Sequence, residues 1–99
     1  MLKIDKNANG NDLIVAIAGR LDTNTAPELD NELKGELDGV TTLIIDMTGL
    51  DYISSAGLRV LLSLQKTMNK QGQMKVTNAG STIMEVFEVT GFTDILTIE

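Results

Sequence analysis

The chain has 99 residues, of which 42% are hydrophobic and 22% are charged; its net charge is −6, and it contains no cysteine and no histidine. A chain of this length forms one domain with one core, and the two missing residue types exclude disulfides, thiol or imidazole catalysis and His/Cys metal sites. The acidic balance disfavours nucleic acid and anionic membranes as partners, because both attract cationic protein surfaces.

The N-terminus and the apolar runs bear on where the protein works. Residues 1–10 contain no basic region followed by an apolar stretch, so we expect no signal peptide. No apolar run approaches the roughly 20 residues that an α-helix needs to span a bilayer. We therefore expect a single cytoplasmic domain over residues 1–99, with no membrane contact.

The first two predicted strands form a β-hairpin. Apolar and polar side chains alternate over residues 2–6, which is typical of a half-exposed edge strand. Residues 7–12 are turn-forming and contain Asn-Gly, a strong short-range hairpin signal. Residues 13–18 are apolar throughout and predict a more buried strand that ends at Gly19.

A helix is predicted after a loop at residues 20–24. Thr25 can cap its first turn, Glu28 completes a capping box, and Pro27 stands where its missing N–H costs nothing. Gly39 is expected to end the helix. The inward face is a row of leucines at helical spacing: Leu29, Leu33 and Leu37.

The most strand-like run of the chain is residues 40–46, where consecutive β-branched and apolar side chains predict a central strand covered on both faces. Residues 47–53 are predicted to be a connecting loop. A long helix is expected from Ser55 or Ala56 to residue 71 or so, and Gly72 ends it. Its apolar stripe consists of Leu58, Leu61, Leu62 and Met68.

The last third of the chain predicts a strand, a short helix and a final strand. Residues 73–78 form the strand, Ser81 caps a helix that runs through Glu88, and residues 95–98 form the last strand. The element order is β-β-α-β-α-β-α-β, and strands that alternate with helices require a mostly parallel sheet. We therefore predict a single α/β domain with a mixed, mostly parallel sheet of about five strands.

The segment Ser54-Ser55-Ala56-Gly57 opens a helix just after a predicted strand and loop. In parallel α/β sheets, functional groups gather beyond the carboxyl ends of the strands. A helix N-terminus there has unpaired N–H groups and tolerates a phosphate, and Gly57 leaves room for another surface to approach. A serine in this place is also an ordinary N-cap. The residues alone therefore leave a cap and a regulatory site open.

Four motifs in this order resemble a STAS domain. They are Gly19-Arg20-Leu21-Asp22, Thr25-Ala26-Pro27-Glu28-Leu29, LIIDMTGL at residues 43–50 and YISSAGL at residues 52–58. FEVTGF at residues 87–92 fits as well, so the similarity extends nearly from end to end. More narrowly, the chain is similar to the free-standing bacterial anti-sigma factor antagonists.

The resemblance implies a partner-switching cycle. In that family the unphosphorylated antagonist binds an anti-sigma factor, which is also a serine kinase with a histidine-kinase-like ATPase fold, and binding frees the sigma factor for transcription. The kinase phosphorylates a serine at the start of the helix after the central strand, the complex dissociates, and a PP2C-type phosphatase restores the antagonist. By register that serine is Ser55 here, with Ser54 as the other candidate.

The resemblance also implies residues that contact the partner. Asp22 matches an acidic position of the family close to the modified serine, and Ser54 stands where the family commonly has aspartate. Residues in the same loop and around the serines are expected to take part with Asp22: Thr25, Ile53, Ser54, Ala56 and Gly57. Ile53, an apolar residue beside the serines, suits a docking surface or the core equally well. Asp46, at the end of the central strand, is expected either to hydrogen-bond the loop that contains Thr48 or to act in recognition.

Two other functions stay open. STAS-like domains also serve as constitutive adaptors in signalling or transport assemblies, without control by phosphorylation. A small enzyme or nucleotide-binding protein is disfavoured, because the chain has no histidine, no cysteine and no phosphate-binding glycine motif. We expect no catalytic residue, no metal and no cofactor in the chain itself.

Overall fold

In a computed structural model, which describes residues 2–99, the chain forms five β-strands, three α-helices and one 3-10 turn. In chain order the elements are β1 (Leu2–Asn9), β2 (Asp12–Leu21), α1 (Ala26–Leu33), β3 (Thr42–Ile53), α2 (Ser55–Asn69), β4 (Gln73–Thr77), α3 (Ser81–Thr90), the turn η1 (Phe92–Asp94) and β5 (Thr97–Ile98). The predicted α/β class and the order of strands and helices are confirmed.

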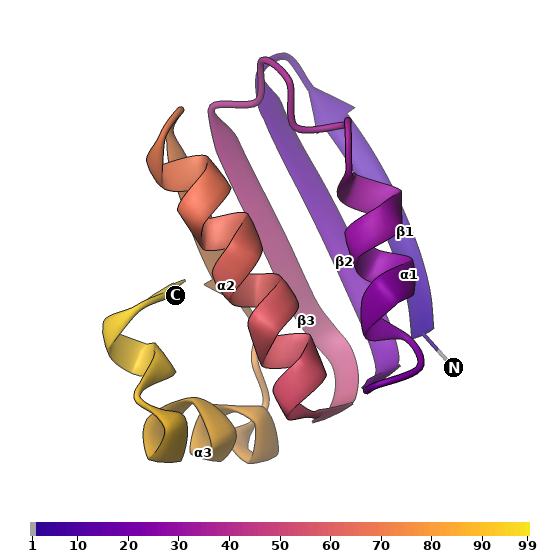
Figure 1. Ribbon diagram of the computed structural model, residues 1–99, viewed down its shortest axis with the longest axis vertical. Helices are drawn as coiled ribbons and strands as arrows, with labels where there is room; N and C mark the ends of the chain where they lie inside the picture. Colours follow the sequence, from indigo (N-terminus) through magenta and orange to yellow (C-terminus); the bar gives the residue numbers. More distant parts are fainter. Residues whose placement is uncertain (1) are drawn as a thin grey trace.

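The strands lie side by side in the order of the sequence, β1-β2-β3-β4-β5. β1 and β2 are antiparallel, whereas β2, β3, β4 and β5 run parallel to one another. Because the chain leaves each parallel strand at the same end, the carboxyl ends of β2, β3 and β4 lie together with the first turns of α1 and α2. This is the lower end in Figure 1, where α3 lies at the lower left and packs against β3.

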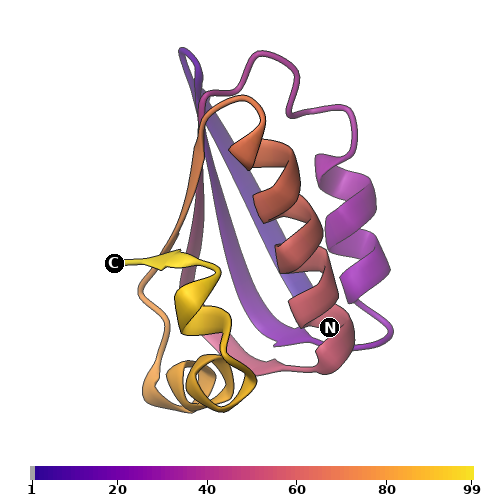
Figure 2. The ribbon, with the colours of Figure 1, turned by 60° about the vertical axis from the view of Figure 1, so that its left-hand side comes forward.

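Helices α1 and α2 cover one face of the sheet (Figure 2). On β3, the side chains of Leu43, Ile45 and Met47 point to this face and are fully buried. Ile44 points the other way and is only half-buried beside Ile14 of β2. β3 is therefore fully covered on one face alone, which corrects the prediction of a strand covered on both faces.

The hairpin is longer than predicted. β1 continues past residue 6 to Asn9, which pairs with Asp12. The two-residue turn is therefore Gly10-Asn11, and Gly10 has the positive φ of 64° that the first position of such a turn favours. The alternating pattern found in the sequence thus covered only the first part of the strand.

Lys6 points from the edge strand β1 toward α1. Its Nζ lies 2.8 Å from a carboxylate oxygen of Glu32 and 2.8 Å from one of Glu36. Hydrogen bonds to these two carboxylates raise the pKa of Lys6 above its ordinary value. A lysine that points inward from an edge strand hinders the pairing of that edge with another chain.

The predicted boundaries of the first and last helices need correction. α1 ends at Leu33, because Lys34 is extended (ψ 121°), so Leu37 lies outside the helix and is half-buried. α3 begins with Ser81 as its first residue rather than its cap; the N-cap is Gly80, and no side chain caps this helix.

Residues 47–53, predicted as a loop, are the second half of β3. They pair with the end of β2, where Gly19 lies opposite Leu50 and Arg20 lies opposite Tyr52, with irregular register on the way. The side chain of Leu50 is buried. Pairing and burial therefore override the turn-like composition of this stretch, and β3 leads directly into α2.

Candidate functional site

Ser54 is the single residue between β3 and α2. Its backbone N–H donates to the carbonyl oxygen of Leu21 at the end of β2 (2.9 Å), and its own carbonyl oxygen accepts from the N–H of Leu58 (3.0 Å). Its hydroxyl oxygen accepts a long hydrogen bond from the N–H of Gly57 (3.4 Å). Ser54 is therefore the N-cap of α2, and it ties this helix to β2.

Ser55 is the first residue of α2, and its side chain is exposed. Within residues 2–99 its hydroxyl makes no hydrogen bond, in contrast to the hydroxyl of Ser54. The unpaired N–H groups and the dipole of the helix favour negative charge at this position. The structure thus distinguishes the two serines: Ser54 caps the helix, and the Ser55 hydroxyl is exposed and makes no hydrogen bond within residues 2–99.

Gly57 is buried in the first turn of α2, where it packs against Leu21 and Ile53. A side chain at this position would collide with both of them. The absence of a side chain at Gly57 therefore lets the first turn of α2 pack closely against the ends of β2 and β3. It does not open a space on the surface.

Asp22 closes the loop between β2 and α1. Its Oδ1 accepts hydrogen bonds from the N–H groups of Thr25 (3.1 Å) and Asn24 (3.0 Å). The bond from the Thr25 N–H is the main cause that holds the pKa of Asp22 below its ordinary value; Asn24, the Thr25 hydroxyl and the charge of Arg20 act in the same direction, against partial burial. The Asp22 carboxylate is thus negatively charged and held in place by hydrogen bonds. It directly follows Leu21, whose carbonyl oxygen accepts from the N–H of Ser54.

Thr25 does not cap α1 with its side chain, which corrects the predicted capping box. Its hydroxyl donates to the carbonyl oxygen of Arg20 (2.7 Å) and accepts from the N–H of Asp22 (2.8 Å). The side chain is buried, at 5% exposure. Thr25 therefore holds the loop closed from inside and offers a partner no side-chain surface.

Sequence reasoning also missed a pair of exposed side chains beside the serines. The guanidinium of Arg20 lies 4.1 Å from the ring centre of Tyr52, and Arg20 Nε lies 3.6 Å from Asp22 Oδ2. Tyr52 is 39% exposed, whereas Ile53 is 4% exposed and belongs to the core. Of the two roles open to Ile53, a docking residue or a core residue, the structure shows the second. The exposed apolar residue before the serines is Tyr52.

Asp46 has a structural role on a different part of β3. Its Oδ1 accepts hydrogen bonds from the Thr48 hydroxyl (2.6 Å), the Thr48 N–H (3.0 Å) and the amide of Asn78 (3.1 Å). The Thr48 hydroxyl, followed by the Asn78 amide, holds the pKa of Asp46 below its ordinary value. Asp46 therefore joins β3 to the end of β4, as the first of its two predicted roles requires.

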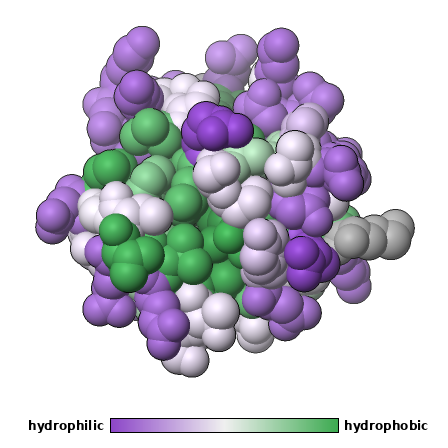
Figure 3. All heavy atoms as spheres, turned by 60° about the horizontal axis from the view of Figure 1, so that its bottom comes forward, coloured by the Kyte–Doolittle hydropathy of each residue, from purple (hydrophilic) through white to green (hydrophobic). Residues whose placement is uncertain are grey.

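The end of the molecule that carries the serines also has an apolar surface. Figure 3 views this lower end, and apolar side chains gather in the middle of the face. On α3, Val89 is 85% exposed, and Met84 and Val86 are half-buried. The site thus combines a free hydroxyl, a fixed carboxylate, an Arg–Tyr pair and apolar surface at one end of the sheet.

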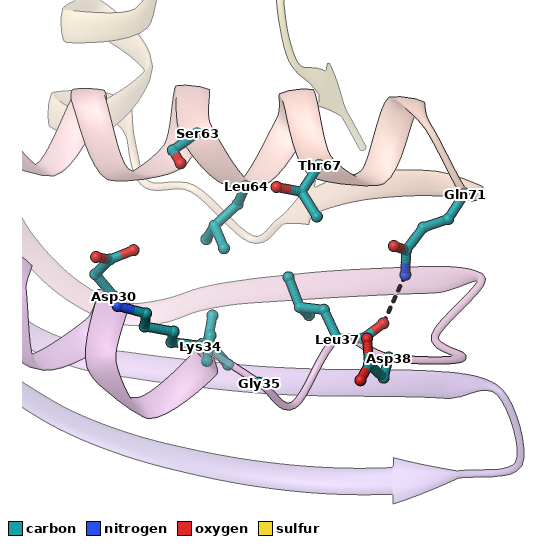
Figure 4. Close-up of a pocket in the computed structure, with 10 residues that line it drawn as sticks. Asp30, Lys34, Gly35, Leu37, Asp38, Ser63, Leu64, Thr67 and Gln71 are labelled. Atoms are coloured by element: carbon teal, nitrogen blue, oxygen red, sulfur yellow. Dashed lines mark hydrogen bonds between the residues drawn. The ribbon is translucent and has the colours of Figure 1, made fainter.

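Two open grooves lie between α1 and α2. The one next to Ser55 has a volume of about 430 Å³ and is bordered from α1 by Ala26, Pro27 and Asp30, and from α2 by Ala56, Arg59 and Val60. The other lies toward the far end of the helices (Figure 4). There Gln71 Nε2 donates to the carbonyl oxygens of Leu37 and Val40, at 2.6 Å each. These hydrogen bonds join the segment after α2 to the segment between α1 and β3, so this groove has a structural role.

Within residues 2–99, no group of three or more carboxylates could hold a metal ion. No helix of this part of the chain is long and apolar enough to cross a membrane.

Residues 3–99 match the family described as the STAS domain. The chain belongs to the STAS family. This STAS domain is 36% identical over 88 residues to the putative anti-sigma factor antagonist BtrV of Bordetella bronchiseptica, a match that covers 87% of this chain and 76% of the relative. It is 33% identical over 98 residues to the anti-sigma-B factor antagonist of Bacillus subtilis, covering 98% and 90% of the two chains.

Two solved structures illustrate the shared fold. An anti-sigma factor antagonist from Mycobacterium paratuberculosis superposes with a TM-score of 0.89 at 20% identity, over 99% of this STAS domain and 85% of that chain. The Bacillus cell fate determinant SpoIIAA in its phosphorylated form gives a TM-score of 0.75 at 17% identity, over 100% and 91% of the chains. At these identities the comparison establishes the fold.

Proposed function

We propose that this STAS domain is an anti-sigma factor antagonist whose binding is switched off by phosphorylation of Ser55. One observation carries the proposal: Ser54 is committed to capping α2, while the Ser55 hydroxyl is exposed and makes no hydrogen bond within residues 2–99. Two relatives named as anti-sigma factor antagonists, and a neighbouring structure described as phosphorylated, support it.

The partner is an anti-sigma factor that is also a serine kinase with a histidine-kinase-like ATPase fold. The kinase transfers the γ-phosphoryl group of its bound ATP: the Ser55 Oγ forms a bond to phosphorus, the bond from phosphorus to the oxygen bridging to the β-phosphate breaks, and ADP leaves. The hydroxyl proton passes to a base on the kinase. A PP2C-type phosphatase reverses the modification, with water attacking phosphorus and inorganic phosphate leaving. All of this takes place in the cytoplasm.

The phosphate acts by charge. It adds about −1.5 to −2 charge units to the end of the sheet that also holds the carboxylate of Asp22. Any partner group that faces this end of the sheet must then lose water beside a strong negative charge. A penalty of about 3 kcal/mol, within the range of unfavourable interfacial charge, weakens association roughly a hundredfold. The STAS domain itself catalyses nothing in this scheme; it is the substrate of the kinase and the inhibitor of its complex.

Mass spectrometry of the protein purified from its own cells, with and without phosphatase treatment, tests the modification. A phosphate on Ser55 that the phosphatase removes is the expected result. A phosphate on Ser54 would keep the switch and overturn the assignment of the residue. No phosphate under any growth or stress condition would overturn the switch and favour the constitutive adaptor.

Binding is tested by co-purification from the same cells, with the captured proteins identified by mass spectrometry. The unmodified chain and Ser55→Ala are expected to bring down an anti-sigma factor of the kinase fold, whereas Ser55→Asp is expected to lose it. Thr41→Asp is the control, because Thr41 is also exposed and stands just before β3, at the opposite end of the sheet. Equal binding by Ser55→Asp and the unmodified chain would favour the adaptor.

A further inference from the structure

Arg59 lies on α2 four residues after Ser55, and both side chains are exposed. Residues four apart on a helix are neighbours on its surface, with Cβ atoms roughly 6 Å apart. Arg59 also borders the groove between α1 and α2, next to Ala56. Its guanidinium is therefore within reach of any group attached to the Ser55 hydroxyl.

The guanidinium of Arg59 has no anionic partner in the described part of the chain. The ion pairs among residues 2–99 use Lys3, Lys6, Arg20 and Lys75, and none of them uses Arg59. Asp30 of α1 borders the same groove but forms no ion pair with Arg59. An arginine without a partner can donate two parallel hydrogen bonds to the oxygens of a phosphate.

The first turns of α2 lack negative charge. Its first turn has no acidic residue, and Arg59 is the one charged side chain of residues 55–62. A helix dipole favours anions near the N-terminus and disfavours cations there. The beginning of α2 thus combines the positive end of the helix dipole with the positive charge of Arg59, and no anion lies in its first turns. A phosphate on Ser55 would supply that anion.

We propose that Arg59 is the positioning residue for phosphorylated Ser55, and that its guanidinium binds the phosphate across one turn of α2. The proposal rests on the proposed phosphorylation of Ser55. The paired guanidinium stabilises the dianion of the phosphate and fixes it over the groove toward α1. The carboxylates of Asp22 and Asp30, on the neighbouring loop and helix, disfavour the dianion, so Arg59 is the cation that offsets them; Arg20 is already paired with Asp22.

The test uses phosphoserine inserted at position 55 during synthesis of the full chain, so that no kinase is needed. A ³¹P NMR titration at physiological ionic strength measures the second pKa of the phosphate. Arg59→Gln is expected to raise this pKa by about half a unit, a roughly threefold change in proton affinity, and Arg59→Lys is expected to retain most of the wild-type value.

Lys66→Gln is the matched control, because it removes the same charge from the same helix but lies about 16 Å from Ser55 along the helix axis, beyond the screening length of about 8 Å. It is expected to leave the pKa unchanged. Thermal unfolding of the unphosphorylated variants checks that each of them is folded. An unchanged pKa in Arg59→Gln, or an equal shift in Lys66→Gln, would overturn the role of Arg59. Neither result depends on whether cells phosphorylate Ser55, so the two proposals fail separately.

Discussion

Gly57 lies in contact with Leu21, across the junction between α2 and the end of β2. A Cβ at residue 57 would come within 2.8 Å of Leu21 Cγ, 2.9 Å of Ile53 Cγ1 and 3.0 Å of the Leu21 carbonyl oxygen. Leu21 is fully buried and its carbonyl also accepts from Ser54, so neither side of the contact can move freely. The position of Ser55 therefore depends on a glycine two residues further along the helix.

Gly57→Ala is expected to lower the free energy of unfolding by about 1–3 kcal/mol, the usual cost of overpacking a core. Helix propensity alone would favour alanine by up to about 1 kcal/mol, so a net loss identifies the close contact. Urea unfolding measures the change. Gly80→Ala shows the same change without a collision, because a Cβ there meets nothing within 4 Å and its φ is −71°; as the N-cap of α3 it is expected to cost less than about 1 kcal/mol. A Gly57→Ala variant as stable as the wild type would contradict this account of the junction.

Thr25→Val is expected to cost about 1–3 kcal/mol of stability, although the two side chains have nearly the same shape. The change removes the hydroxyl that joins the Arg20 carbonyl to the Asp22 N–H, and it leaves both backbone groups without this partner. Urea unfolding again gives the value. Thr23→Val in the same loop is exposed and is expected to change stability by less than about 0.5 kcal/mol. Equal effects at the two positions would refute the role assigned to Thr25.

Asp46→Asn is expected to destabilise the protein by about 1 kcal/mol at pH 7, and by less as the pH falls. Its pKa is lowered in the folded state, so the stability it contributes is present above the ordinary value of about 3.9 and is lost as the pH falls through the folded pKa. Urea unfolding at several pH values between 7 and 3 tests this. Asp51→Asn, at an exposed carboxylate of the same strand, is the control. A difference that grows toward acid pH would contradict the prediction.

Lys6→Ile is expected to increase self-association through the edge of β1. The change removes the inward-pointing charge and extends the apolar row that Leu2 and Ile4 begin on the same face of the strand. Burying one such side chain is worth about 1.5–3 kcal/mol, so the association constant should rise at least roughly tenfold. Sedimentation equilibrium measures it. Lys3→Ile removes the same charge from the other face of the strand and is the control. If both variants associate equally, the inward direction of Lys6 is not the protecting feature.

The sequence allowed the class, the element order and the start of α2 to be predicted because each depends on local patterns. Alternation and apolar runs marked the strands, and the serines preceded a clear helical stripe. The second half of β3 could not be predicted in this way. Residues 47–53 look like a turn until their partners on β2 are known, and the register between Arg20 and Tyr52 is a property of two segments far apart in the chain.

The site was predicted in part for the same reason. Both serines and Asp22 were found from local motifs and resemblance. Thr25 has the spacing of a capping box, but its hydroxyl donates to the carbonyl oxygen of Arg20 at the end of β2. The local pattern therefore predicted the wrong hydrogen-bond partner for this hydroxyl. Ile53 and Tyr52 alternate on a strand, and which of them is exposed depends on the face that α2 covers.

The spatial order of the strands has a consequence for how the protein folds during synthesis. Each strand lies beside the one made before it, so every new strand can add to the free edge of the sheet already formed, and none has to insert between two others. The hairpin of β1 and β2 needs no distant residue and can form within microseconds. β3 can therefore add to a hairpin that is already formed, and Ser54, whose N–H binds the end of β2, can be placed before β4 and β5 join the sheet.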